Sequence, residues 1–271
     1  MDTPPLPAEL TRDVLRHLGV TAAKPDLSLL DALFTAYTRT IPWETAFRIA
    51  RRSQTTITGD CPRWPDVFWR DALERGGGGT CFESNYAFYS LLLALGYTGY
   101  LTINNMEDSI GCHTAIVLTI NEERWLADVG IPLYCPLPLN HQAVTRRSSP
   151  FQQYTIRPDG ENRFQVERSP HPKPNIFTLI DVPVSDAAYR AATTTDYGAD
   201  GLFLDKIIVS KIIAGKPWYF NNQRLPFHLE SFQDGERTDH PLNGDIPGHI
   251  AQHFSLAADV LRIAWDAVEV E

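Results

Sequence analysis

Two differently patterned parts of the chain meet at the ten residues Gly76-Gly77-Gly78-Gly79-Thr80-Cys81-Phe82-Glu83-Ser84-Asn85. Apolar residues continue from this stretch to Leu95, and Gly96 follows where a helix would end. The pattern predicts a helix that begins at Cys81. Thr80 and Glu83 have the T-x-x-E spacing of a capping box, so we expect their side chains to cap the start of this helix.

Cys81 is the candidate nucleophile of the chain. At the first position of a helix, free N–H groups and the helix dipole favour a thiolate. The four glycines before it would leave the thiol open to a substrate, and nearby N–H groups would be available to an oxyanion. The alternative interpretation is a small buried cysteine at a helix start. The other cysteines, Cys61, Cys112 and Cys135, have no comparable context and are interpreted as structural.

The part of the chain before this stretch has the apolar spacing of helices. Leu10, Val14 and Leu18 recur every four residues and are followed by Gly19, which predicts a first helix and its end. A similar pattern covers residues 30–37. A third helix is expected from Pro65 to Arg75, because proline suits a helix start and glycines follow.

Beyond residue 96 the pattern changes to short β-like runs. Strands are expected at residues 100–104, 113–120, 124–129, 151–156, 163–167 and 176–182, and again between residues 206 and 232. A short helix at 186–192 and a last helix at 249–268 complete the prediction. Helices followed by strands and a mixed tail indicate an α+β fold with an antiparallel sheet or barrel.

His113 and Asp128 are the candidate base and its orienting carboxylate. His113 opens one predicted strand, and Asp128 ends the next, in an otherwise apolar run. If Asn121 and Glu122 alone form the turn between them, Asp128 faces Ala115, and His113 lies two positions along on the same face. A three-residue turn would put the two side chains on opposite faces. Such a dyad is what a thiol nucleophile requires, although a histidine that is only structural is the alternative.

Composition limits the classes of function. The chain has 271 residues with 24 Lys and Arg against 33 Asp and Glu, which gives a net charge of 24 − 33 = −9, so a nucleic-acid partner is not expected. The N-terminal residues have neither a basic nor an apolar signal region, and no apolar run is long enough for a membrane span. We therefore expect a cytoplasmic protein with reduced thiols. The cysteines form no CxxC pair, and no metal or bound cofactor is expected.

Taken together, these motifs resemble those of the arylamine N-acetyltransferase family. The segment Ile41-Pro42-Trp43-Glu44 is similar to the family's I-P-F-E, residues 81–85 to its C-F-E-x-N, and residues 127–130 to its V-D-V-G. The fifteen-residue step from His113 to Asp128 also matches. Residues 203–209 and 249–254 are similar to the family's third-domain strand and final helix, so the resemblance extends over essentially the whole chain.

The resemblance implies a cysteine-proteinase-like core in three domains. These are a helical bundle at 1–96 that carries the nucleophile, an antiparallel β-barrel at 97–195 that carries the histidine and the aspartate, and an α/β lid at 196–271. It also implies a ping-pong reaction in which Cys81 takes an acyl group from acetyl-CoA and passes it to an arylamine, hydrazine or hydroxylamine. Acetyl-CoA would be a co-substrate. The implied substrate contacts are Trp43, Phe82, Gly130, Ile131 and Phe203, of which the aromatic residues alternatively belong to the core.

The chain departs from the family pattern at three places. Gly77 stands where the family usually has the arginine of R-G-G-x-C, and the nearest arginine before the cysteine is Arg75. Thr80 stands where an aromatic residue usually precedes the cysteine. Ile131-Pro132 replaces the usual Phe-Gly after the aspartate motif. These positions are where the family has its acceptor and CoA contacts.

Three other functions fit the same residues. The first is an amide synthase whose donor is a thioester on an acyl carrier protein. The second is a transglutaminase-like thiol hydrolase, because that class also has the order Cys, His, Asp. The third is a non-enzymatic protein that retains the triad, or that holds a metal through Cys81, Cys112 and His113. Joint chelation is disfavoured because neighbouring strand residues point to opposite faces.

Overall fold

The computed structural model describes residues 3–269. Its first part is helical, and the elements there are α1 (Ala8–Leu18), α2 (Leu27–Thr40), α3 (Ala46–Gln54), a 3-10 turn (Thr58–Asp60), α4 (Pro65–Arg75) and α5 (Cys81–Ala94). The helix predicted at 65–75 has the predicted limits. Proline occupies its first turn, and Gly76 ends it in the left-handed conformation, at φ 67°. Helix α3 was not predicted.

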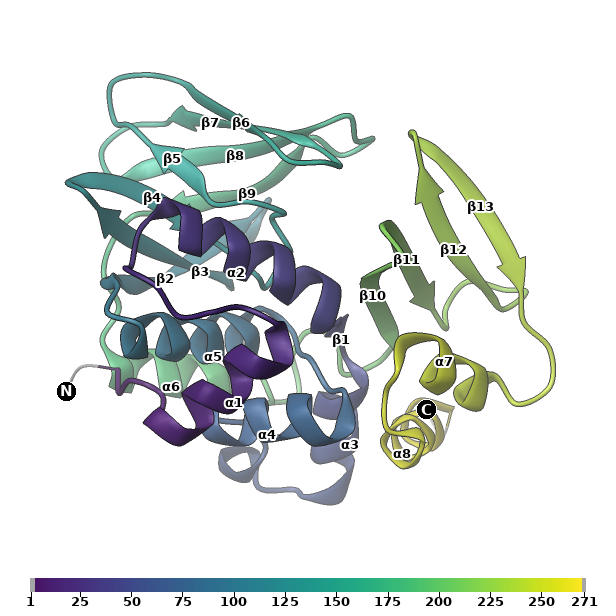
Figure 1. Cartoon of the computed structure of the whole chain (residues 1–271). Coiled ribbons are helices and arrows are strands. Elements are labelled where there is room, and N and C mark those ends of the chain that lie inside the picture. The colour runs from purple at the N-terminus through teal and green to yellow at the C-terminus, as the bar shows by residue number, and fades with distance from the viewer. Residues whose placement is uncertain (1–2, 270–271) are drawn as a thin grey trace.

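The second part is an eight-stranded antiparallel sheet. Its strands are β2 (Thr98–Met106), β3 (Ser109–Ile120), β4 (Glu123–Ala127), β5 (Leu137–Leu139), β6 (Thr145–Ser148), β7 (Gln153–Pro158), β8 (Arg163–Ser169) and β9 (Asn175–Ile180). The strand order is β5-β4-β3-β2-β9-β8-β7-β6. The two edge strands approach each other, since Thr145 Oγ1 donates to the Pro138 carbonyl at 2.6 Å. The sheet is therefore a nearly closed barrel (Figure 1).

The third part follows α6 (Asp186–Thr195). It contains β10 (Ile208–Ile213), β11 (Lys216–Asn221), β12 (His228–Gln233), β13 (Glu236–Pro241), α7 (Ile246–Phe254) and α8 (Ala258–Glu269). These strands form a five-stranded sheet in the order β1-β10-β11-β12-β13, in which β1 (Trp43–Glu44) comes from the helical part. The single helix predicted at 249–268 is wrong. Ser255 adopts a left-handed φ of 60°, which breaks the segment into α7 and α8.

Two hydrophobic cores hold these parts together. The larger lies between the N-terminal helices and the barrel and includes Phe34, Phe88 and Leu118. The smaller joins one face of α3, with Phe47 and Ile49, to the C-terminal sheet and helices. Figure 1 shows α3 at the border between the helical part and α7 and α8. The α+β fold is thus confirmed.

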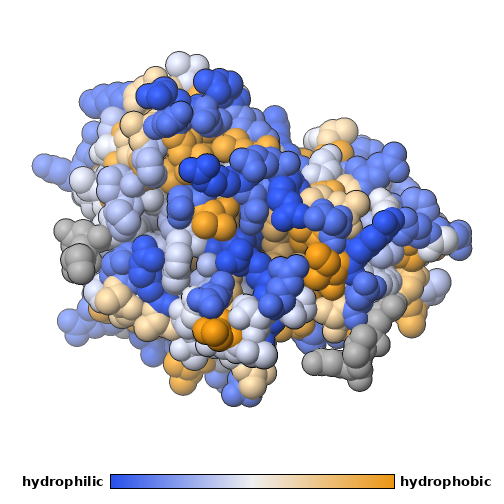
Figure 2. All heavy atoms as spheres, turned by 90° about the horizontal axis from the view of Figure 1, so that it is seen from below, coloured by the Kyte–Doolittle hydropathy of each residue, from blue (hydrophilic) through white to orange (hydrophobic). Residues whose placement is uncertain are grey.

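The domain limits at 96 and 195 remain a prediction. The first and last of the predicted domains include Met1, Asp2, Val270 and Glu271, which lie outside the described residues. On the face shown in Figure 2, hydrophobic side chains form separate groups among hydrophilic ones. Within residues 3–269, no helix is long and apolar enough to cross a membrane.

Candidate active site

Cys81 is the first residue of α5, as predicted, but the predicted capping box is wrong. Thr80 is the N-cap residue and its side chain makes no capping hydrogen bond. Its Oγ1 accepts a hydrogen bond from Arg48 Nη1 at 2.9 Å instead. Glu83 turns away from the helix start, and its carboxylate accepts hydrogen bonds from Arg63 Nη2 at 2.5 Å and Tyr197 Oη at 2.6 Å. Buried arginines are stronger partners than a local amide, so the tertiary contacts replace the local cap.

The glycines before Cys81 lie close to other parts of the protein, and whether they leave the thiol open to a substrate stays a prediction. A Cβ on Gly77 would come within 2.8 Å of the Phe47 ring, and one on Gly78 would overlap the Pro42 carbonyl. The missing side chains therefore make room for neighbouring protein atoms. Although Gly77 replaces the arginine of the family pattern, a guanidinium still reaches this loop. Arg63 Nη2 donates to the Gly78 carbonyl at 2.6 Å, and its guanidinium lies 5.1 Å from the centre of the Phe47 ring.

The hairpin that carries His113 and Asp128 has the predicted register. Ile120 pairs with Glu123, and Ile116 pairs with Ala127, so that Asn121 and Glu122 alone form the turn. Both turn residues have positive φ, at 49° and 67°, which matches the right-handed twist of a two-residue hairpin. His113 Nε2 consequently lies 2.7 Å from Asp128 Oδ2.

The Asp128 carboxylate is fully buried and hydrogen-bonded at both oxygens. Oδ1 accepts from the Gly130 amide at 2.8 Å, from Asn85 Nδ2 at 3.0 Å and from the Ile131 amide at 3.2 Å. Oδ2 is left for His113. This arrangement satisfies the buried carboxylate and fixes its direction.

Asn85 is a positioning residue that sequence reasoning did not assign. It lies one helical turn after Cys81 and also donates to the Thr114 carbonyl at 2.7 Å, while its Oδ1 accepts from the Val129 amide at 2.9 Å. Thr114 Oγ1 in turn donates to the Cys81 carbonyl at 2.9 Å. The i, i+4 spacing from Cys81 was the available signal, because it puts both side chains on one helix face.

The Asp128 carboxylate favours the protonated form of the His113 ring. Burial alone would lower the pKa of its ring, but the charge and hydrogen bond of Asp128, with a further contribution from Cys81, raise that pKa to about 10. The ring lies 4.5 Å from the Phe177 ring, and among the described residues its Nδ1 has no hydrogen-bond partner. Cys81 Sγ lies 3.7 Å from the Cys112 carbonyl. The thiol, the ring and the carboxylate are thus brought together as predicted.

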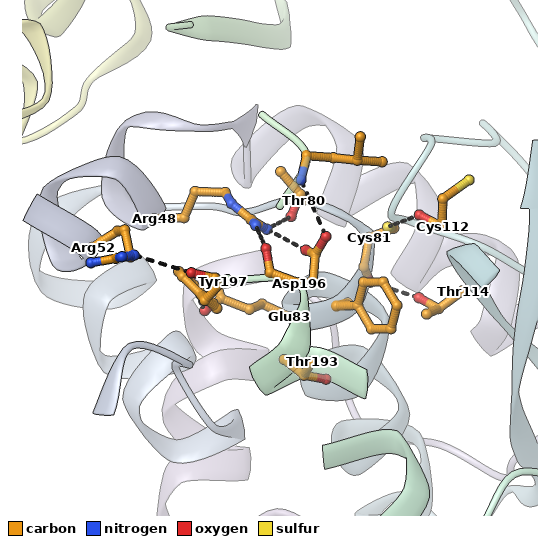
Figure 3. A network of polar contacts seen from close by, with 12 residues as sticks. Arg48, Arg52, Thr80, Cys81, Glu83, Cys112, Thr114, Thr193, Asp196 and Tyr197 are labelled. Carbon is orange, nitrogen blue, oxygen red and sulfur yellow. Dashed lines mark hydrogen bonds and ion pairs between the residues drawn. The ribbon is translucent and has the colours of Figure 1, made fainter. Parts of the chain in front are cut away.

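A second polar network links Thr80 to Arg48 and Asp196 (Figure 3). Arg48 Nη1, which contacts Thr80, also donates to Asp196 Oδ2 at 2.8 Å, and Arg48 Nη2 donates to the Asp196 carbonyl at 2.6 Å. The Arg48 guanidinium lies 4.5 Å from the centre of the Tyr197 ring. Burial raises the pKa of Asp196, although Arg48 opposes this effect. The network ties the nucleophile helix to the segment that follows α6.

The residues predicted to contact substrate lie in different surroundings. Trp43 Nε1 donates to the Gly130 carbonyl at 2.5 Å, and the Trp43 and Phe203 rings meet edge to face at 5.3 Å. Ile131, which follows Gly130 in the sequence, is half-buried. Phe82 is 2% exposed within the larger core, a position that favours packing. Substrate contacts by all five residues remain a prediction.

Gly130 allows the aspartate loop to approach the nucleophile closely. A Cβ there would come within 2.6 Å of both Cys81 Cβ and Asn85 Nδ2. Glycine is therefore required for this contact. Among residues 3–269, no group of three or more His, Cys, Asp and Glu side chains is placed to hold a metal ion.

A comparison of the sequence with models of known protein families finds a match. The sequence model of one family, described as N-acetyltransferase, matches residues 26–259. A search of curated protein sequences finds no match.

Solved structures of arylamine N-acetyltransferases are similar to this chain. The enzyme from Salmonella typhimurium shares 16% identity with a TM-score of 0.80, over 96% of this chain and 99% of that one. The Mycobacterium marinum enzyme in complex with CoA shares 15% sequence identity with a TM-score of 0.80, over 95% of this chain and 98% of that one. A Bacillus cereus enzyme with a Cys-His-Glu catalytic triad shares 18% sequence identity with a TM-score of 0.73, over 92% of this chain and 98% of that one. The family match spans most of the sequence and these structures share its fold, so the chain belongs to the N-acetyltransferase family and has the fold of the arylamine N-acetyltransferases.

Proposed function

We propose that the protein transfers an acetyl group from acetyl-CoA to the nitrogen of an arylamine, hydrazine or hydroxylamine through a thioester on Cys81. In this ping-pong reaction Cys81 is the nucleophile, His113 transfers the protons and Asp128 orients the His113 ring. The observation that carries the proposal is the buried His113–Asp128 contact of 2.7 Å, with the other ring nitrogen unpartnered among the described residues. That nitrogen is free to serve the thiol and the substrates.

In the first half-reaction the Cys81 thiolate attacks the thioester carbonyl of acetyl-CoA. An imidazolium beside a thiol favours the thiolate, and the raised pKa of His113 supplies that charge at neutral pH. Because Thr80 does not cap α5, the amides of the first helical turn remain available to the oxyanion of the tetrahedral intermediate. When this intermediate collapses, the C–S bond to CoA breaks and His113 gives its proton to the leaving CoA thiolate.

In the second half-reaction the amine nitrogen attacks the acetyl-Cys81 thioester. Neutral His113 removes the proton that the nitrogen loses, so the amide product leaves and the Cys81 thiolate and His113 imidazolium are restored. The proton count therefore balances over one cycle. Asp128 keeps Nε2 engaged throughout, so that the same ring nitrogen serves both steps.

A CoA thioester is favoured over a carrier-bound thioester as donor. The similar Mycobacterium marinum structure is a complex with CoA. A carrier protein as partner, water as acceptor and a cytoplasmic location are left as predictions.

The experiment that tests the proposal is intact mass spectrometry after incubation with acetyl-CoA and no amine. We expect one acetyl adduct, located on Cys81 by peptide mapping, which disappears when an arylamine or hydrazine is added and yields the acetylated amine. The Cys81→Ser variant should give no adduct, whereas Cys61→Ser and Cys135→Ser, matched changes at two other buried thiols, should retain it. No adduct at saturating acetyl-CoA would overturn the proposal. Labelling only by an acylated carrier protein, or loss of the adduct to water without amine, would indicate the amide synthase or the hydrolase.

A further inference from the structure

The segment after α6 brings one more carboxylate to the nucleophile. Asp196 shares the Nη1 group of Arg48 with Thr80, the residue directly before Cys81. Burial raises the pKa of the Cys112 thiol, and the charge of Asp196 adds a smaller contribution in the same direction; the Cys112 carbonyl contacts Cys81 Sγ. In Figure 3 the Asp196 carboxylate stands between the Arg48 guanidinium and Cys81. Asp196 is thus linked, through Arg48 and Thr80, to the residue directly before the nucleophile.

Asp196 differs from the other carboxylates of this region in its exposure. The side chains of Glu44, Glu83 and Asp128 are 0–1% exposed, whereas that of Asp196 is 13% exposed. The fully buried carboxylates are satisfied by protein groups. Of these four carboxylates, the one that a small molecule can reach is therefore that of Asp196.

One of the two Asp196 oxygens has spare hydrogen-bonding capacity. Oδ2 is held by Arg48 at 2.8 Å. The hydrogen bond that Oδ1 accepts within the described chain comes from the Leu202 amide, and it is long, at 3.4 Å. Leu202 is 40% exposed and directly precedes Phe203, which contacts Trp43. Oδ1 thus lies at the end of this network that meets the exposed Leu202, the residue before one member of the aromatic pair predicted to contact substrate.

We propose that Asp196 is a specificity-determining residue whose Oδ1 accepts a hydrogen bond from the inner N–H of a hydrazide or hydrazine acceptor. Such an acceptor attacks through its terminal nitrogen and carries a second N–H one bond away. A simple arylamine has no such inner N–H. Arg48 holds the carboxylate in place through one hydrogen bond to Oδ2 and a second to the Asp196 backbone carbonyl, so the acceptor meets a fixed charge. The inference rests on the proposed acyl transfer and assigns its preferred acceptor class.

The test compares an aryl hydrazide with its N-methyl analogue, in which a methyl group replaces the hydrogen of the inner nitrogen. Acylation of Cys81 by acetyl-CoA is measured first for every variant, and acceptor kcat/KM is then compared as a ratio between the two hydrazides. The wild type should prefer the hydrazide by roughly tenfold, the effect of one hydrogen bond to a charged group. Asp196→Asn should reduce the preference to roughly threefold, because a neutral acceptor is about half as strong. A purely steric effect of the methyl group would persist in Asp196→Asn.

The matched control is Asp205→Asn in the same segment. The Asp205 side chain is 57% exposed and lies 3.5 Å from Lys206, so this change should leave the tenfold preference intact. Equal use of both hydrazides by the wild type, or an unchanged ratio in Asp196→Asn, would refute the role of Asp196. A wild type whose Cys81 is never acylated would instead refute the acyl transfer itself. A wild-type ratio near one would refute the role of Asp196 even if Asp196→Asn folds poorly.

Discussion

At the scale of single residues, the site depends on how fully Asp128 is satisfied. Three donors occupy Oδ1, and His113 occupies Oδ2. The donors therefore orient the carboxylate, and the carboxylate orients the His113 ring. The sequence predicted Cys81, His113 and Asp128, because a helix start and a hairpin register are local patterns. It did not assign Asn85 or Asp196, because both act through partners far away in the chain.

The raised pKa of His113 predicts a pH-dependent stability. Its value of about 10 in the folded protein exceeds the 6.5 of an ordinary histidine, so the folded state binds a proton more tightly than the unfolded state. The resulting stabilisation is complete below pH 6.5, falls as the pH rises, and is lost above about 10. Urea unfolding of the wild type and of His113→Gln should therefore give a difference in free energy of unfolding that shrinks across this range. Asp128→Asn should lose the same pH dependence, and a difference that stayed constant would contradict the assignment.

At the scale of elements, the site is the junction of α5 with the β3–β4 hairpin. Periodicity and a two-residue turn predicted both elements, since these signals depend on neighbours in sequence. The capping box was wrong for the opposite reason. Arg48 and Arg63 come from other segments and take the polar groups that a local cap would use.

Gly130 allows the junction to close, which gives a prediction for Gly130→Ala. The added methyl would overlap Cys81 and Asn85, so we expect a loss of about 1–3 kcal/mol in stability and at least a tenfold loss of Cys81 acylation. Gly59→Ala is the matched control, because a Cβ there meets no atom within 4 Å and the backbone φ is not positive. Chemical unfolding and the acetylation rate measure the two effects. Equal behaviour of the two variants would show that this contact is not tight.

At the scale of the whole molecule, buried charges join segments that are far apart in sequence. Arg63 is fully buried and binds Glu83, with Glu44 at 3.9 Å. Burial would raise the pKa of Glu83, but Arg63 and Tyr197 lower it, whereas burial prevails at Glu44 and raises its pKa. Such a network was not predictable from the sequence, because arginine and glutamate are usually surface residues and nothing local marks these as buried.

Removal of Arg63 should therefore be costly. We expect Arg63→Met to lower the free energy of unfolding by about 3–5 kcal/mol, because it leaves Glu83 buried without its cation. Arg157→Met is the control, since Arg157 pairs with Glu167 at the surface and should cost less than about 1 kcal/mol. Both values come from urea unfolding. Similar losses in free energy of unfolding for the two variants would show that the buried pair stabilises the fold no more than the surface pair.

The approach of Arg63 to the glycine loop has a consequence for homologue detection. A search pattern that demands arginine four residues before the cysteine would pass over this chain, although a guanidinium contacts the loop from another segment. At position 77 itself, the Phe47 ring fills the space that a side chain would need. In distant relatives, a glycine at this position should therefore be sought together with an aromatic residue matching Phe47 and an arginine matching Arg63.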